Sequence, residues 1–349
     1  MNFIRKELKE FRESKGLLID VRSPDEYYKG HMPNSINIPL FNNEERAIVG
    51  KRYKINGKEN AIIKGLEIVE HKLENLISEF VSANKLYLKN KKDKASINIF
   101  KIYCARGGMR SKSIFWLLNK LNFQTIILNG GYKNYRRSVL DKFNEKINII
   151  LIGGKTGSGK TKILNMLKDK NYQIIDLEYL ANHRGSTFGA LGMKEQPSNE
   201  QFENLIEEEI FKFDKKKEIF IEAESSNIGR CRIPNELFKQ MRHSARIEII
   251  RSEKDRIKEL VNTYSLFSKN ELIESVLRIK KKLGPQRTKS AIQSVENEDW
   301  YKVCTSVLEY YDKCYEYELR GKKNVSELNL IDVKDNKIIS KMIKSGLIN

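Results

Sequence analysis

Short apolar runs alternate with amphipathic segments along most of the chain, which is the pattern of strands followed by helices. The predicted strands are residues 17–21, 97–103, 125–128, 147–152, 172–175, 218–221 and 246–250. Between the second and third of these runs, apolar side chains recur at helical spacing and predict a helix over residues 109–121. Strands that alternate with helices favour parallel sheets covered on both faces.

From about Arg251 onward the pattern becomes mainly helical. A stripe at three- and four-residue steps consists of Trp300, Val303, Cys304, Val307, Leu308, Tyr311 and Tyr315. We interpret this stripe as helix core, and Cys304 and Cys314 as packing residues. The resulting division is a first α/β domain at 1–140, a second at 141–255, and a mainly helical region at 256–349 packed on the second domain.

The composition is that of a soluble globular protein. The chain has 349 residues, of which 40% are hydrophobic and 32% are charged, and a length of this size suggests about two domains. No apolar run approaches the roughly 18 residues that span a bilayer, and no hydrophobic segment follows the charges near the start. We therefore expect a cytoplasmic protein with no membrane partner.

A net charge of +19 favours a polyanionic partner, with nucleic acid ahead of membrane. A lysine-rich, AT-biased genome would give the same excess. The densest positive segment is residues 278–289, which contains Lys280, Lys281, Lys282 and Arg287. Taken alone, a solvated helix end explains this segment equally well.

Cys104 lies in a loop between a predicted strand and a predicted helix. Backbone N–H groups and the positive end of the helix dipole would both favour its thiolate. Gly107 and Gly108 allow the loop to curl into an anion nest. Arg106 and Arg110 can add charge-assisted hydrogen bonds to a bound oxyanion. The loop therefore predicts a nucleophile beside an oxyanion site, against the alternative of a buried structural cysteine.

The run Gly154-Lys155-Thr156-Gly157-Ser158-Gly159-Lys160-Thr161 follows a predicted strand and precedes a helix. Its spacing is that of a phosphate-binding loop, in which backbone N–H groups cradle phosphates, the lysine adds charge and the threonine holds Mg²⁺. The loop predicts binding of a di- or triphosphate and does not tell which. The predicted phosphate-binding residues are Gly154, Gly157, Ser158, Gly159, Lys160 and Thr161, with Arg184 as a phosphate clamp. Glu222 and Glu224 close a neighbouring strand, where a metal-organising carboxylate is expected, and Thr161 and Glu222 form the candidate metal site.

The first half of the chain resembles the rhodanese family. The resemblance covers residues 20–27, 30–39, the Cys104 loop and 129–132, and in that family the loop cysteine carries a transferable chalcogen as a persulfide. Asp20 and His31 are then scaffold residues rather than catalysts. The Cys-x5-Arg spacing from Cys104 to Arg110 is one residue longer than in common rhodaneses and also matches cysteine phosphatases. Phosphatase chemistry therefore stays open.

The order of the two units resembles the tRNA 2-selenouridine synthase family. The strings that carry this resemblance are residues 42–50, 104–111, 182–189, 222–229 and 283–287. It implies an N-terminal rhodanese-like parallel-sheet domain, then a P-loop NTPase-like α/β domain with a helical C-terminal region. It also implies an enzyme that converts wobble 2-thiouridine of tRNA to 2-selenouridine through an S-geranylated intermediate, using geranyl diphosphate and selenophosphate.

The resemblance assigns roles to the candidate residues. Cys104 would act in the selenium step as nucleophile or carrier, with selenophosphate held by Arg106, Gly107, Gly108 and Arg110. The phosphate loop would bind geranyl diphosphate, and Lys280, Lys281, Lys282 and Arg287 would contact tRNA. No tightly bound cofactor is expected, Mg²⁺ is a candidate ion, and a selenophosphate synthetase would supply selenophosphate. The alternative from another class is a nucleotide-dependent phosphotransfer or regulatory protein with a sulfurtransferase- or phosphatase-like rhodanese unit.

Overall fold

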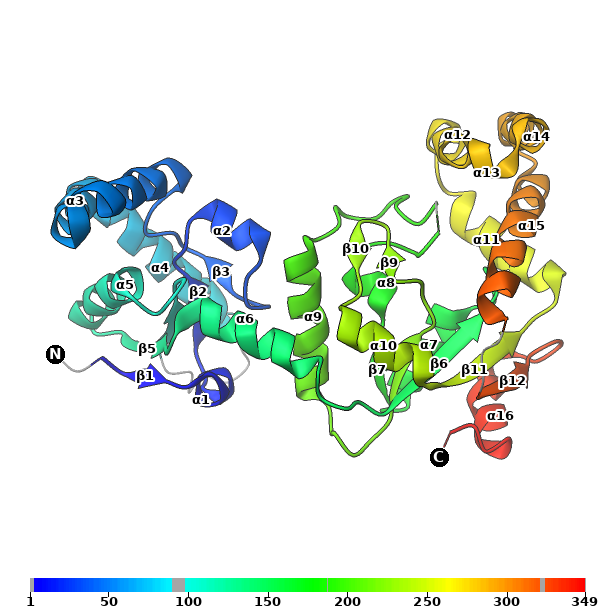
Figure 1. The fold of residues 1–349 in the computed structure, drawn as a ribbon, viewed down its shortest axis with the longest axis horizontal. Helices are drawn as coiled ribbons and strands as arrows, with labels where there is room; N and C mark the ends of the chain where they lie inside the picture. The colour runs from blue at the N-terminus through cyan, green and yellow to red at the C-terminus, as the bar shows by residue number, and fades with distance from the viewer. Residues whose placement is uncertain (1–2, 90–97, 187, 321–323, 349) are drawn as a thin grey trace. The chain divides into compact units, whose positions relative to one another are not determined.

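The computed structural model describes residues 3–89, 98–186, 188–320 and 324–348, which form two compact units (Figure 1). The first unit is Met1–Lys142 and the second is Phe143–Asn349. Each is built on a five-stranded parallel sheet with helices, so the predicted α/β class is confirmed. The helices that follow residue 252 belong to the second unit.

The sheet of the first unit has the strand order β1-β5-β4-β2-β3. Its strands are β1 (Arg5–Lys6), β2 (Leu17–Asp20), β3 (Ile36–Asn37), β4 (Ile99–Tyr103) and β5 (Gln124–Leu128). Its helices are α1 (Leu8–Glu13), α2 (Pro24–Lys29), α3 (Asn43–Glu70), α4 (Leu73–Lys89), α5 (Met109–Lys120) and α6 (Gly131–Lys142). Apolar side chains of β2, β4, α4 and α5 form the core, and Ile19, Phe80 and Phe100 are fully buried within it.

The sheet of the second unit has the strand order β12-β11-β6-β8-β7. Its strands are β6 (Ile149–Gly154), β7 (Gln173–Ile175), β8 (Ile219–Glu222), β11 (Ala245–Ile250) and β12 (Val325–Asn329), and a hairpin joins β9 (Asn227–Ile228) to β10 (Cys231–Arg232). Strand β12 was not expected, because only Leu328 of its five residues is buried. Such an edge strand gives no apolar run in the sequence.

The helices of the second unit fall into two groups. Those between the strands are α7 (Lys160–Asp169), α8 (Leu177–Leu180), α9 (Asn199–Lys212) and α10 (Asn235–His243). Those after β11 are α11 (Glu253–Tyr264), α12 (Lys269–Arg278), α13 (Lys280–Leu283), α14 (Pro285–Glu296), α15 (Trp300–Leu319), the 3-10 turn η1 (Asp335–Lys337) and α16 (Ile338–Lys344). The mainly helical character predicted for this region is confirmed.

The apolar runs locate the central strands to within about two residues at each end. The run 97–103 forms β4 over Ile99–Tyr103, while Ile97 lies outside the described residues. The predicted helix 109–121 forms α5. Among the described residues, no helix is long and apolar enough to cross a membrane.

Candidate functional site

Cys104 comes directly after β4, at the carboxyl edge of the first sheet. The loop that follows ends at Gly108, the residue that caps the N-terminus of α5. Gly107 has a φ of 62°, in the left-handed region that favours glycine. The Cys104 side chain is only 3% exposed, so the thiol lies at the base of the loop rather than on its surface.

The first residues of α6 bind the backbone of this loop through hydrogen bonds. The backbone N–H groups of Tyr132 and Lys133 donate to the carbonyl oxygens of Cys104 and Ala105, both at 2.9 Å. A Cβ atom at Gly131 would lie 2.3 Å from the carbonyl oxygen of Cys104 and 2.4 Å from the nitrogen of Gly107. Only glycine fits at this contact, so Gly131 allows the cysteine loop to lie directly against the start of α6.

A buried ion pair lies beside the end of β4. The Asp20 carboxylate is fully buried and accepts hydrogen bonds from Nε and Nη2 of Arg22, the latter at 2.6 Å. The Arg22 guanidinium also covers the ring of Tyr132 at 3.7 Å from its centroid. His31 stacks on Tyr27 and contacts the Tyr27 carbonyl oxygen through Nδ1. Asp20 and His31 thus support the fold, as expected for scaffold residues.

The two arginines of the cysteine loop differ in their surroundings. Arg110 donates to both carboxylate oxygens of Glu26, at 2.6 and 3.1 Å, and is only 16% exposed. Burial alone would raise the pKa of Glu26, but the hydrogen bonds and charge of Arg110 lower that pKa to about 2. Arg106 is exposed. An anion at this loop would therefore meet Arg106 directly, while Arg110 is held in place by a carboxylate.

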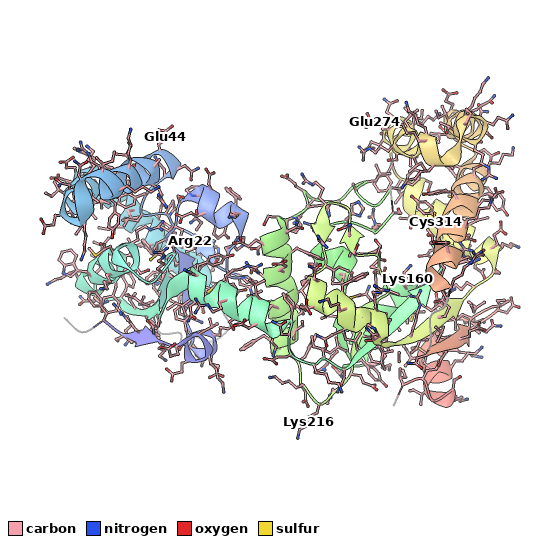
Figure 2. All side chains as sticks on the ribbon, in the orientation of Figure 1. Arg22, Glu44, Lys160, Lys216, Glu274 and Cys314 are labelled. Atoms are coloured by element: carbon pink, nitrogen blue, oxygen red, sulfur yellow. The ribbon has the colours of Figure 1, made fainter. Side chains whose placement is uncertain are left out.

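The phosphate loop joins β6 to the N-terminus of α7, as its spacing predicts. Gly154, Gly157 and Gly159 all have positive φ angles, of 150°, 79° and 84°. The Lys160 ammonium donates to the Gly154 carbonyl oxygen at 3.2 Å and so lies back across the loop (Figure 2). The Ser158 hydroxyl is buried and has no hydrogen-bond partner among the described residues.

Helices α11 and α15 support this loop from outside the sheet. The Tyr315 hydroxyl accepts the N–H of Gly154 at 2.5 Å and donates to Glu248 at 2.7 Å. Arg256 donates to the Thr156 carbonyl oxygen at 2.8 Å and is paired with Asp312 at 2.6 Å. Burial raises the pKa of the Tyr315 phenol above its ordinary range, so this hydroxyl stays neutral. From the sequence, Tyr315 is expected only as part of a packing stripe.

Three carboxylates gather beside Thr161. Ligand atoms of Glu178, Glu222 and Glu224 all lie within 4.8 Å of one another, and the Thr161 hydroxyl donates to Glu178 at 3.4 Å. Burial and the nearby Glu224 raise the pKa of Glu178 to about 8, and burial and Glu178 raise the pKa of Glu222 well above its usual range. Neither oxygen of the fully buried Glu222 has a hydrogen-bond partner in the part of the chain described. Glu178 was missed by sequence reasoning, because nothing local separates it from an ordinary helix residue.

A cavity of about 1040 Å³ lies over the phosphate loop. It is lined by the loop and by Glu178, Arg184, Glu224, Lys282, Cys314 and Tyr315. Arg184 is anchored by a hydrogen bond from Nη1 to the Leu191 carbonyl oxygen at 2.7 Å. Cys314, interpreted from the sequence as a packing residue, is instead exposed on this wall, because its face of α15 points away from the helical core (Figure 2). Cys304 does pack in that core.

The basic segment is divided between two surfaces. Lys280 and Lys281 line a separate groove of about 590 Å³ together with Lys289. Lys282 lines the phosphate-loop cavity instead. Arg287 forms an ion pair with Glu309 at 3.0 Å. The four residues predicted to bind RNA are thus exposed, but they do not share one environment.

Comparisons with known proteins match both units. A family model described as the tRNA 2-selenouridine synthase AAA domain matches residues 147–343, and the rhodanese-like domain model matches residues 5–138. The tRNA 2-selenouridine synthase of Sulfurovum sp. is 32% identical over 89% of this chain and 90% of that protein. The one from Shewanella denitrificans is 31% identical over 88% of this chain and 89% of that protein. The one from Nitrosomonas europaea is 32% identical over 71% of this chain, but the alignment spans only 63% of that protein.

We predict that Gly131→Ala displaces the cysteine loop, whereas Gly108→Ala leaves the fold intact. The new methyl group at position 131 meets backbone atoms that cannot yield easily, and the φ of 59° is strained for alanine. Such overpacking costs about 1–3 kcal/mol. A Cβ atom at Gly108 meets nothing within 4 Å. Hydrogen–deuterium exchange of the full chain, read in peptides from residues 98–142, should be faster for Gly131→Ala alone, and equal exchange in the two variants would contradict the contact.

Proposed function

The chain belongs to the tRNA 2-selenouridine synthase family, and we propose that it converts wobble 2-thiouridine of tRNA to 2-selenouridine through an S-geranylated intermediate. Geranyl diphosphate and selenophosphate would be the co-substrates. One observation carries the proposal: the same chain has two strand–loop–helix junctions of different chemistry. A cysteine loop follows β4 at the carboxyl edge of the first parallel sheet, and a phosphate loop follows β6 at the carboxyl edge of the second. Both loops lie within the matched ranges 5–138 and 147–343.

In the first step, the thiocarbonyl sulfur of the uridine attacks the allylic carbon of geranyl diphosphate. A carbon–sulfur bond forms, the carbon–oxygen bond breaks, the electron pair leaves with diphosphate, and N3 of the uridine loses its proton to solvent. Lys160, Arg184 and the N-terminus of α7 would stabilise that charge, since fixed donors in a water-poor site act most strongly where charge develops. All of them lie at one cavity.

In the second step, the Cys104 thiolate would attack C2 of the geranylated uridine as a nucleophile, and the carbon–sulfur bond to the geranylated sulfur would break with release of geranylthiol. The selenium of selenophosphate would then displace Cys104 from C2, and water would cleave the phosphorus–selenium bond and release phosphate. The exposed Arg106 and the backbone of Gly107 and Gly108 would bind the selenophosphate oxyanion, and Arg110 would orient it from its pairing with Glu26. A selenophosphate synthetase would supply this substrate in the cytoplasm.

The fold family implies a divalent cation beside the phosphate loop, and the residues present fit one. Glu222 brings two buried carboxylate oxygens with no partner among the described side chains, and oxygen ligands of this kind suit Mg²⁺. Thr161 and Glu222, joined by Glu178 and Glu224, would hold the ion. A bound Mg²⁺ supplies neutralisation of charge on a diphosphate.

A second candidate is a nucleotide-dependent phosphotransfer or regulatory protein. The phosphate loop and its carboxylates favour it, because they serve nucleoside triphosphates equally well. The two functions differ in what drives them: selenation needs tRNA, geranyl diphosphate and selenophosphate, but no nucleotide.

The first test is nucleoside mass spectrometry of thiolated tRNA incubated with geranyl diphosphate, with and without selenophosphate. We expect geranylthiouridine in both reactions and selenouridine only when selenophosphate is present. Cys104→Ala should still geranylate and should form no selenouridine, because the thiol acts only in the second step. Cys231→Ala removes another buried thiol and should behave as wild type.

Two results would contradict this assignment. Full selenation by Cys104→Ala would remove Cys104 from the reaction. Absence of geranylthiouridine with the wild-type protein, together with tRNA-independent hydrolysis of ATP or GTP, would favour the second candidate.

The cation site predicts that Glu222→Gln weakens binding of Mn²⁺, a paramagnetic substitute for Mg²⁺, by at least about tenfold. The substitution keeps the side-chain shape but removes the charge that the ion requires. Glu259→Gln is the matched control, because Glu259 lines the same cavity outside the carboxylate cluster. Electron paramagnetic resonance of free Mn²⁺ measures the affinity, and equal values for the two variants would exclude this site.

The groove lined by Lys280, Lys281 and Lys289, here called the basic groove, predicts a change in the salt dependence of tRNA binding when its lysines are replaced. Replacing Lys280 and Lys281 with glutamine should flatten the log–log slope of affinity against salt by up to about 1.4–1.8, since each lost phosphate contact contributes about 0.7–0.9. Lys282→Gln should in addition weaken binding of diphosphate, because Lys282 lines the phosphate-loop cavity.

The matched control for the basic groove is the double replacement of Lys216 and Lys217, which are exposed in the loop between α9 and β8. Titrations at several salt concentrations should show no change of slope for this control. An equal change in both double variants would mean that the effect is one of net charge and not of the groove.

A further inference from the structure

The middle of α3 projects from the first unit without a buried side chain. Every residue from 51 to 60 is exposed, and ten consecutive residues cover all sides of a helix. Gly57 bends the helix here with a φ of 81° and a ψ of 179°, and a Cβ atom at that position would meet nothing within 4 Å. The glycine therefore serves the bend and not the packing. We call residues 51–60 the α3 elbow (α3 is labelled in Figure 1).

The helix is anchored to the first unit on both sides of the elbow. Before it, the Asn42 side chain caps α3 by accepting the backbone N–H of Glu45 at 2.8 Å. After it, Ala61 and Gly65 are buried, and a Cβ atom at Gly65 would lie 3.2 Å from the Phe41 ring. Packing of one face supplies most of the stability of a helix in a protein. The elbow lacks such packing, so its side chains are free for a partner.

The elbow carries positive charge that the protein does not neutralise. Its charged residues are four cations and one carboxylate, namely Lys51, Arg52, Lys54, Lys58 and Glu59. None of the three lysines forms an ion pair with a side chain in the described part of the chain. A cluster of this sign on a projecting segment attracts a polyanion.

Two large side chains lie among these cations. Tyr53 is 59% exposed and Ile55 is 67% exposed. RNA loops and single strands use both features, because their phosphates bind cations and their unpaired bases stack on aromatic rings. In a regular duplex the faces of the bases are already stacked on one another. The elbow therefore suits a looped or single-stranded RNA.

Tyr53 lies on the face of α3 that reaches the cysteine loop. Arg46 precedes it by seven residues and so shares its face of the helix. The Arg46 guanidinium approaches the Glu26 carboxylate at 3.8 Å, and Glu26 in turn binds Arg110 of the cysteine loop at 2.6 Å. Seven residues correspond to about 10 Å along a helix. An RNA loop on the elbow is therefore about two helical turns from the residues that contact this loop.

Resting on the proposed function, we propose that the α3 elbow binds the anticodon loop of tRNA. Tyr53 stacks on a base of that loop, and Lys51, Lys54 and Lys58 bind the neighbouring phosphates. The elbow thereby holds the loop at the first unit while the wobble uridine reacts at Cys104. This surface is distinct from the basic groove, which belongs to the second unit.

The test measures binding of the full-length protein to the isolated anticodon stem–loop of a thiolated tRNA, by fluorescence anisotropy at several salt concentrations. Tyr53→Leu keeps a helix-forming side chain and should weaken binding at least about fivefold, the lower end of what one stacked base contributes. The log–log slope of affinity against salt should not change, because no charge is lost. Tyr301→Leu is the matched control and should bind as wild type, since Tyr301 is 56% exposed on α15.

Replacing the three elbow lysines with glutamine should flatten that slope by up to about 2.1, because each lost contact with a single strand contributes about 0.7. The matched control replaces three lysines that are exposed elsewhere in the first unit, Lys9, Lys15 and Lys85. This control should keep the wild-type slope. Circular dichroism of all variants should match the wild type, because the replaced side chains are exposed.

Three results would overturn the inference. The first is equal affinity of Tyr53→Leu and Tyr301→Leu for the stem–loop. The second is an equal change of slope in the two triple variants, which would assign the effect to net charge. The third is loss of self-association by Tyr53→Leu in analytical ultracentrifugation with unchanged RNA affinity, which would assign the elbow to a second copy of this chain.

Failure of this inference and failure of the proposed function give different results. If the wild-type protein forms selenouridine and Tyr53→Leu binds and reacts as Tyr301→Leu does, only the role of the elbow is wrong. If the elbow variants lose the stem–loop as expected but the wild-type protein modifies no tRNA, the elbow stands as an RNA-binding surface and the proposed reaction is wrong.

Discussion

The phosphate loop depends on contacts from α15, which lies about 150 residues further along the chain. A loop with three glycines at positive φ has little conformational preference of its own. The Tyr315 hydroxyl and the Arg256–Asp312 pair supply the missing constraint by binding its backbone at Gly154 and Thr156. Because α15 also lines the cavity, any movement of this helix changes the phosphate loop and the cavity over it together.

Charge in the cavity is arranged as two opposed groups. Lys160, Arg184 and Lys282 provide cations, while Glu178, Glu222 and Glu224 crowd three carboxyl groups beside Thr161. Burial and mutual repulsion keep the pKa values of Glu178 and Glu222 high, so the cluster is poorly stabilised as three anions. Under the proposed function, a diphosphate with a divalent cation would satisfy both groups at once, which neither ligand would do alone.

The sequence predicts those structural features that are encoded by residues close together in the chain. Apolar runs located the central strands, and the glycine spacings around Cys104 and Lys160 located both loops, because a strand–loop–helix junction is encoded within about ten residues. It could not locate Glu178 in the carboxylate cluster, the exposed position of Cys314, or the separation of Lys282 from Lys280. Each of these depends on which elements pack together across the fold. Strand β12 was missed for the same reason, since pairing with β11 and not hydrophobicity defines it.

Each reactive loop is built from residues of its own unit. The contacts described for the cysteine loop come from β2, α2 and α6, and those for the phosphate loop come from β11, α11 and α15. Under the proposed function, each chemical step therefore depends on contacts made within one unit. Lys160 and Arg184 of the second unit would meet diphosphate in the first step, and Cys104 and Arg106 of the first unit would act in the second. The contacts that hold either loop in place can then change without disturbing those that hold the other, because no residue is shared between the two sets.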